Sequence, residues 1–155
     1  MSQLAGSGIT VDVPSGWEGR IYAKHERGPR PTGTLERNPN AVVHVASFPL
    51  PPGIGDYGGG AVEQMTNTDL LVILLEHGRQ SANSPLFAPA GVPRITIDDV
   101  STTCLQRLID GQGGAQKFFN VDGRAFCLYV VFGSYLRRGR TIPVVNDILR
   151  TVSIS

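Results

Sequence analysis

Apolar and polar residues alternate near the N-terminus and predict a short strand over residues 9–13. The period of two in ITVDV is typical of a strand with one buried face. Pro14 ends this strand, and Gly16 accepts the positive φ of a turn, so we expect the chain to reverse there. Trp17 is then expected to fold back over the strand as a lid on the core, and residues 21–22 to begin a short second strand.

Two longer apolar runs predict buried strands. Residues 41–50 are almost wholly apolar, which predicts a central strand covered on both faces, with His44 as a hydrogen-bonded core residue. Residues 69–78 predict a second buried strand. A helix stays open as the alternative for this leucine-rich run, because Gly78 suits the end of either element.

The dipeptide Asp122-Gly123 predicts a β-hairpin, because it is typical of a two-residue turn and lies between two β-rich runs. The predicted cross-strand pairs are Val121 with Arg124, Phe119 with Phe126, and Phe118 with Cys127. One face would carry Phe119, Phe126, Leu128, Val130 and Phe132, and the other Phe118, Cys127, Tyr129 and Val131. Since both faces are mostly apolar, we expect the hairpin to lie between layers, in the centre of the sheet.

A short helix with one apolar face is predicted over residues 141–149, followed by a last edge strand over 150–154. Thr141 is expected to cap the helix, and Pro143 fits its first turn. Alternating residues over 95–100 predict a further strand. The apolar face of the helix would consist of Ile142, Val145, Ile148 and Leu149.

Proline and glycine mark two expected mobile loops, residues 25–40 and 51–60. Residues 61–65 are expected to form one or two helical turns. The segment GIGDYGGG in the second loop lacks the lysine of a phosphate-binding loop, so we expect no nucleotide or other cofactor.

The totals bound the class of protein. A chain of 155 residues fits one domain with a sizeable core, and its 19 glycines and 11 prolines favour strands and turns over long helices. We therefore predict a single α+β domain over residues 1–155, a mostly antiparallel sheet flanked by short helices. The formal net charge of +1 excludes the strongly basic balance of a protein held to nucleic acid by phosphate contacts.

No signal peptide or membrane span is expected. The apolar block at residues 70–75 is far shorter than the roughly 20 residues that cross a bilayer. We expect a cytoplasmic protein, with an excised anchored or exported domain and a homodimer left open.

Residues that could carry chemistry show no catalytic spacing. Cys104 and Cys127 are expected to be reduced thiols, with a disulfide as the alternative. The three histidines lack metal-ligand spacing, so no metal site is expected. Asp98 and Asp99 would point to opposite faces of a strand and are expected to act as strand-end caps.

The charge cluster RRGR supplies the candidate binding residues. Arg137, Arg138 and Arg140 offer planar donors to a partner, and Tyr57 lies in the expected glycine loop. We expect a non-catalytic protein-interaction or assembly module that uses the loops at 25–40 and 51–60 and the arginine cluster as its contact surface. The alternative is a small-molecule-binding protein or enzyme with a pocket between sheet and helix.

The segments GITVDVPSGW, residues 8–17, and VNDILRTVSI, residues 145–154, resemble the PsbP-like family. That family includes extrinsic lumenal subunits of photosystem II, a Ran-binding nuclear import factor and actinobacterial lipoproteins. The resemblance implies an α/β/α-like sandwich that serves as a binding or assembly module, mostly without catalysis. The middle of the chain departs from the family in its long loops, and no functional residue is carried over.

Overall fold

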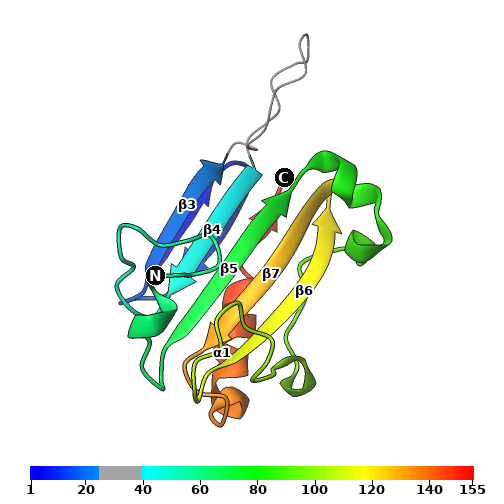
Figure 1. Ribbon diagram of the computed structural model, residues 1–155. Coiled ribbons are helices and arrows are strands. Elements are labelled where there is room, and N and C mark those ends of the chain that lie inside the picture. Colours follow the sequence, from blue (N-terminus) through cyan, green and yellow to red (C-terminus); the bar gives the residue numbers. More distant parts are fainter. Residues whose placement is uncertain (25–39) are drawn as a thin grey trace.

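Five antiparallel strands form the larger of two sheets in the computed structural model, which describes residues 1–24 and 40–155. The strands lie side by side in Figure 1, with β5 in the middle. Their order across the sheet is β3 (Glu18–Lys24), β4 (Asn40–Ala46), β5 (Leu70–His77), β7 (Arg124–Phe132) and β6 (Gly113–Val121).

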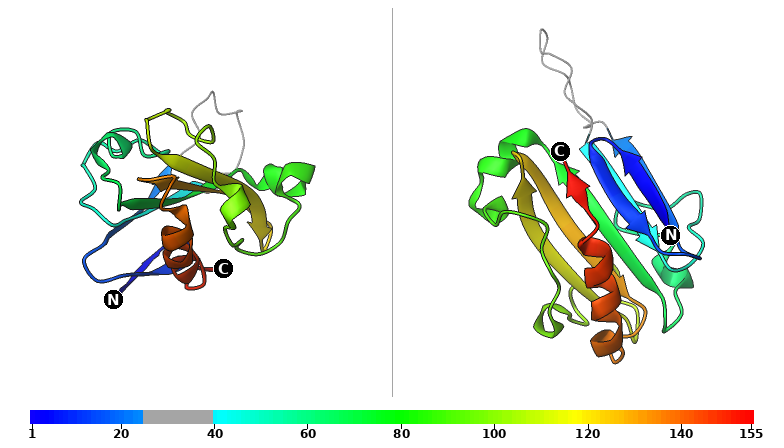
Figure 2. Two further views of the ribbon diagram at one scale, coloured as in Figure 1. Left: turned by 90° about the horizontal axis from the view of Figure 1, so that it is seen from below. Right: turned by 180° about the vertical axis from the view of Figure 1, so that it is seen from behind.

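A second, three-stranded sheet and the α-helix cover one face of the larger sheet (Figure 2). The small sheet has the order β1 (Ser2–Gly6), β2 (Ile9–Val13) and β8 (Ser153–Ile154), and the helix is α1 (Arg138–Leu149). These elements bury their apolar residues against the larger sheet in one continuous core. The structure confirms the predicted α+β fold, a single domain built mainly on antiparallel sheet.

The strand predicted at residues 9–13 is β2, and its end is turned as expected. The Trp17 N–H donates to the Pro14 carbonyl oxygen at 3.0 Å, and Gly16 has a φ of 83°. Trp17 is partly buried and packs against the core. Residues 2–6 carry no clear alternation, and the structure adds them as β1, paired with β2 through a two-residue turn.

The predicted hairpin has the predicted register. β6 and β7 pair Val121 with Arg124 and Phe119 with Phe126, and the expected faces separate onto the two sides of the sheet. The expected central position is wrong, because β6 is an edge strand and β5 lies in the middle. Residues 70–77 form that middle strand, which pairs with β4 and β7, so the helical alternative is excluded.

The helix begins earlier than predicted. α1 starts at Arg138, so Arg138 and Arg140 of the RRGR cluster lie in the helix, and Thr141 lies inside the helix instead of capping it. Pro143 lies beyond the first turn, where its missing N–H leaves the Gly139 carbonyl without its helical partner. The expected apolar face is confirmed, since the four residues predicted for it are buried in the core.

The strand predicted over 95–100 is wrong. Ile97–Asp99 form a 3₁₀ turn, and a capping box closes it: the Thr96 N–H donates to Asp99 Oδ2 at 2.7 Å. Asp99 therefore caps a turn of helix, not a strand. Other 3₁₀ turns cover Val62–Gln64, inside the expected helical segment 61–65, and Arg79–Asn83 and Pro85–Phe87.

The expected loop at residues 25–40 lies outside the described residues, except for Asn40, which begins β4. Residues 51–60 contain no helix or strand and are joined by backbone hydrogen bonds such as Gly58 N–H to the Gly55 carbonyl, 2.9 Å. Within residues 1–24 and 40–155, no helix is long and apolar enough to cross a membrane.

Candidate functional site

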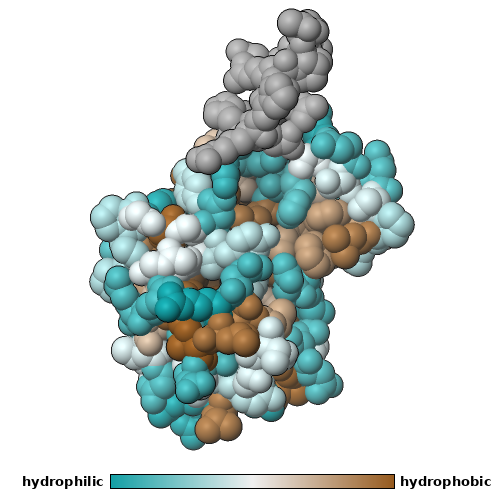
Figure 3. Space-filling view, viewed as in Figure 1, coloured by the Kyte–Doolittle hydropathy of each residue, from teal (hydrophilic) through white to brown (hydrophobic). Residues whose placement is uncertain are grey.

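The face of the larger sheet that points away from α1 is covered by loops. We call it the loop-covered face. Residues 48–65 and 105–109 contribute apolar side chains that pack on it. Hydrophobic surface is visible in the middle of this face, bordered by hydrophilic residues (Figure 3). The sheet residues of this face include Val42, Leu71, Ile73, Leu75, Tyr129 and Val131.

A pocket of about 410 Å³ lies on the loop-covered face, between the glycine segment, residues 55–60, and residues 105–112. This volume is within the range of roughly 300–1,000 Å³ that small-molecule sites occupy. Val62, Leu105 and Val131 give it apolar walls. The pocket therefore joins a sheet floor to two loops that are distant in the sequence.

The glycine segment can lie against the sheet because of Gly58. This residue is buried and has a φ of 86°, and a Cβ there would be 2.6 Å from the Leu71 side chain and 3.2 Å from that of Val62. A larger residue would push the segment off the sheet. The wall of the pocket thus depends on a close approach that only glycine allows.

Two tyrosines meet in the pocket. The rings of Tyr57 and Tyr129 lie edge to face, with centroids 5.6 Å apart at 72°. The Tyr129 hydroxyl oxygen accepts the Gln106 N–H at 2.8 Å, and Tyr129 is only 3% exposed. Among the described residues, no group accepts a hydrogen bond from either hydroxyl. Burial raises the pKa of both tyrosines, so each is a neutral donor at ordinary pH.

Gln112 places an unpaired amide oxygen beside the pocket. The side chain is 4% exposed, and its Nε2 donates to the Val62 carbonyl oxygen at 2.8 Å. Its Oε1 is buried and has no hydrogen-bond partner in the described part of the chain. Such an oxygen costs roughly 1–3 kcal/mol of desolvation that no protein group offsets.

An ion pair joins the two loops at the pocket. Arg107 Nη1 lies 3.0 Å from Glu63 Oε1, and the other Glu63 oxygen accepts the Gly60 N–H at 2.9 Å. Arg107 is exposed, so the pair is solvated and adds little to the stability of the fold. For the pocket, the consequence is that the positive charge of Arg107 is already balanced by Glu63.

Polar contacts from β3 and β4 anchor residues 50–56, which lead into the glycine segment. The Tyr22 hydroxyl donates to Asp56 Oδ1 at 2.7 Å, and Lys24 pairs with the other oxygen of Asp56. Arg20 donates to the carbonyl oxygens of Leu50 and Pro51 at 3.3 and 3.1 Å. The strand edge therefore fixes where the glycine segment begins.

His44 is the buried part of the same anchor. It is fully buried, as predicted, and its Nε2 donates to the Asp56 carbonyl oxygen at 3.0 Å. Burial lowers the pKa of His44, and the opposing effect of Asp56 does not cancel this. Burial alone would raise the pKa of the Asp56 carboxyl, but the hydrogen bonds from Lys24 and Tyr22 hold it below its ordinary value.

The residues predicted to bind a partner do not come together. Tyr57 lines the pocket on the loop-covered face, whereas the three arginines lie at the start of α1, on the other side of the sheet. Arg138 is half-buried, with its guanidinium 3.8 Å from the Tyr135 ring centroid, and it donates to the Tyr135 carbonyl oxygen. Arg137 and Arg140 are exposed.

The two cysteines are unpaired in the structure. Cys127 is buried, and Gln116 Nε2 lies 3.2 Å from its sulfur. Burial raises the pKa of both thiols, which keeps them protonated and weakly nucleophilic. In the part of the chain that the structure describes, no three side chains of the metal-binding types form a cluster.

The sequence identified one residue of the pocket, Tyr57, and missed the others. Val62, Leu105, Gln112 and Tyr129 lie in separate segments and share no motif. Comparisons of the chain with models of protein families, with curated proteins and with solved structures find no match. The likeness to PsbP-like proteins stays a prediction, and function must be argued from the geometry of this chain.

Proposed function

We propose that this domain binds a small, mostly apolar molecule in the pocket between residues 55–60 and 105–112. The observation that carries the proposal is a hollow of about 410 Å³ whose apolar walls hold one buried amide oxygen, Gln112 Oε1, without a hydrogen-bond partner among the described residues. Sites for small molecules combine these two features, a mostly apolar lining and a few placed polar groups. The sequence suggested, as its alternative function, a small-molecule pocket between sheet and helix; this pocket lies instead on the face of the sheet opposite the helix.

The anchored wall supports the proposal. A binding site binds more tightly when its shape exists before the ligand arrives, because less conformational entropy is then lost on binding. The contacts of Asp56 with Tyr22, Lys24 and His44 hold the start of the glycine segment. Gly58 then sets the depth of the wall against Leu71.

The test uses the neutral bicyclic probe 2-acetylnaphthalene and amide NMR spectra. We expect saturable shifts at Gly59, Gln106 and Gln112, which line the pocket. In the variant Leu105→Trp the added ring occupies the pocket, and these shifts should disappear. The matched variant Leu136→Trp, at a residue that is 88% exposed and does not line the pocket, should retain them. Equal shifts in both variants would contradict the proposal.

A second candidate function is favoured by the exposed leucine beside the arginines. Leu136 precedes the exposed Arg137 and Arg140, which together offer an apolar contact and two positive charges to an acidic protein partner. A poly-glutamate peptide is the probe for this surface. The double variant Arg137→Ser/Arg140→Ser should weaken its binding, while Arg79→Ser/Arg107→Ser, with the same loss of charge, should not. An equal loss in both variants would reduce the effect to net charge.

A further inference from the structure

We infer that the pocket selects neutral aromatic molecules that carry a hydrogen-bond acceptor, such as a ketone carbonyl, and that Tyr57 and Tyr129 donate to it. The inference rests on the proposed function and narrows it to a class of ligand. The observations concern the donors, the apolar walls and the charges of the pocket.

The donors are two phenol groups that have no acceptor among the described residues. A phenol has one proton to donate, and the Tyr129 oxygen already accepts the Gln106 N–H. Its proton is left over, on a residue that is almost completely buried. Tyr57 is half-buried and forms no hydrogen bond with the described residues. Both hydroxyls therefore lack an acceptor that a ligand can supply.

The arrangement of the rings suits one acceptor and one ring of a ligand. The edge-to-face contact places the two tyrosines as neighbours on the pocket wall, with centroids 5.6 Å apart. A carbonyl oxygen has two lone pairs and can accept from two donors. The remaining walls, Val62, Leu105 and Val131, are apolar and suit the flat faces and edges of an aromatic ring.

The charges in the pocket favour a neutral ligand over an anion. Arg107 is the one cation among the lining residues, and Glu63 already pairs with it. The unpaired Gln112 oxygen carries partial negative charge and would repel a carboxylate placed near it. Because the pocket provides no unmatched positive charge, burying an anion there is unfavourable.

Three probes of matched shape separate these statements. 2-Acetylnaphthalene has a neutral acceptor, 2-isopropylnaphthalene has nearly the same shape without one, and 2-naphthoate has an anionic acceptor. Dissociation constants come from NMR titration at neutral pH, followed at Gly59 and Gln112. We expect the ketone to bind about 2–10-fold more tightly than the hydrocarbon, as one neutral hydrogen bond allows, and the naphthoate to bind most weakly.

Phenylalanine variants assign the donors. Tyr57→Phe keeps the ring and removes a hydroxyl that no described residue uses, so it should lower the affinity for the ketone and leave the hydrocarbon unchanged. Tyr129→Phe should do the same, with its unfolding measured in parallel because the Gln106 N–H loses its acceptor. Tyr135→Phe, on the helix side of the sheet, is the control and should change neither affinity.

Each failure has a different meaning. If the hydrocarbon binds the pocket as tightly as the ketone, the acceptor inference is overturned and the proposed function stands. If the naphthoate binds most tightly, the pocket is an anion site and the inference is likewise overturned. A preference for the ketone that survives both phenylalanine variants removes the assignment of the donors. If no probe shifts the pocket amides, the proposed function fails and the inference with it.

Discussion

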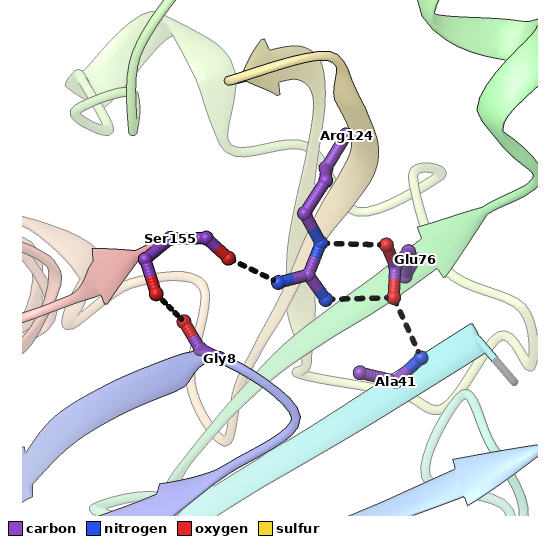
Figure 4. Close-up of polar contacts among 5 residues, drawn as sticks. All are labelled: Gly8, Ala41, Glu76, Arg124 and Ser155. Atoms are coloured by element: carbon purple, nitrogen blue, oxygen red, sulfur yellow. Dashed lines mark hydrogen bonds and ion pairs between the residues drawn. The ribbon is translucent and has the colours of Figure 1, made fainter. Parts of the chain in front are cut away.

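Arg124 and Glu76 form a two-point ion pair across the neighbouring strands β7 and β5 (Figure 4). Arg124 Nε and Nη2 donate to the two Glu76 oxygens at 2.8 and 2.9 Å, and the side chains are only 15% and 10% exposed. Glu76 also accepts the Ala41 N–H at 3.0 Å, and Arg124 donates to the Ser155 carbonyl oxygen at 3.0 Å. The pair therefore links three strands of the larger sheet to the end of β8 in the smaller one.

Removing the charge of Glu76 should destabilise the fold. In Glu76→Gln the Arg124 guanidinium keeps its place but loses its counter-charge in a mostly buried site, and we expect a loss of about 3 kcal/mol of unfolding free energy. Urea unfolding measures it. The control is Asp147→Asn, which breaks the exposed pair with Arg150 and should cost less than about 1 kcal/mol. Similar losses of unfolding free energy in both variants would show that the buried pair stabilises the fold no more than an exposed pair does.

We expect Asn146 to be the residue of α1 that holds Ile95, just before the 3₁₀ turn Ile97–Asp99, against the helix. Its side chain accepts the Ile95 N–H at 2.8 Å and donates to the Ile95 carbonyl oxygen at 2.9 Å. Asn146→Ala leaves both backbone groups of a buried residue unpaired, and we expect a loss of about 2 kcal/mol in thermal or urea unfolding. Asn67→Ala, at an exposed position, is the control; a loss no larger than that of the control would refute the role.

Local patterns predicted the parts of the fold that local chemistry decides. Asp122-Gly123 fixes its own turn, and the register and faces of the hairpin follow from that turn. The segment at 95–100 was mispredicted because the capping box between Thr96 and Asp99 outweighs the alternation of its apolar residues. The start of α1 at Arg138 has no capping side chain to signal it.

The pocket could not be read from the sequence for a different reason. Its apolar residues look like ordinary core residues, and its polar groups matter only because they lack partners among the residues that the structure describes. Gln112 and Tyr129 come from different segments and meet Val62 through the packing of two loops on one sheet face. The Gln112 oxygen is distinguished by having no hydrogen bond to any described residue, which no sequence pattern signals.

The free energy of unfolding should decrease as the pH is lowered below the ordinary pKa of histidine. Burial holds the pKa of folded His44 below its ordinary 6.5, so below that pH the unfolded chain binds a proton that the folded protein does not. The unfolding free energy therefore decreases as the pH falls from 6.5 toward the folded pKa. Asp56 has the opposite charge type and a lowered pKa, so its stabilising contribution is lost only below its ordinary 3.8.

Urea unfolding between about pH 5 and 8 tests this dependence. His44→Phe keeps a ring next to Tyr22 and cannot bind the proton, so its free energy should decline less steeply below pH 6.5 than that of the wild type. Burial also lowers the pKa of His77, and His77→Gln measures that separate share. An unchanged slope in the His44 variant would mean that this histidine is not the titrating group.

Gly58→Ala should destabilise the protein and open the pocket, whereas Gly53→Ala in the same loop should not. The Gly58 φ of 86° strains any L side chain, and the added Cβ would be 2.6 Å from Leu71. We expect a loss of about 2 kcal/mol in urea unfolding and weaker binding of 2-acetylnaphthalene, because the wall moves away from the sheet. Gly53 has no positive φ and no atom within 4 Å of an added Cβ, so its variant tests the loss of glycine alone. If Gly58→Ala kept wild-type stability but lost the probe, the close approach would serve binding alone; if it kept both, the wall would not depend on this glycine.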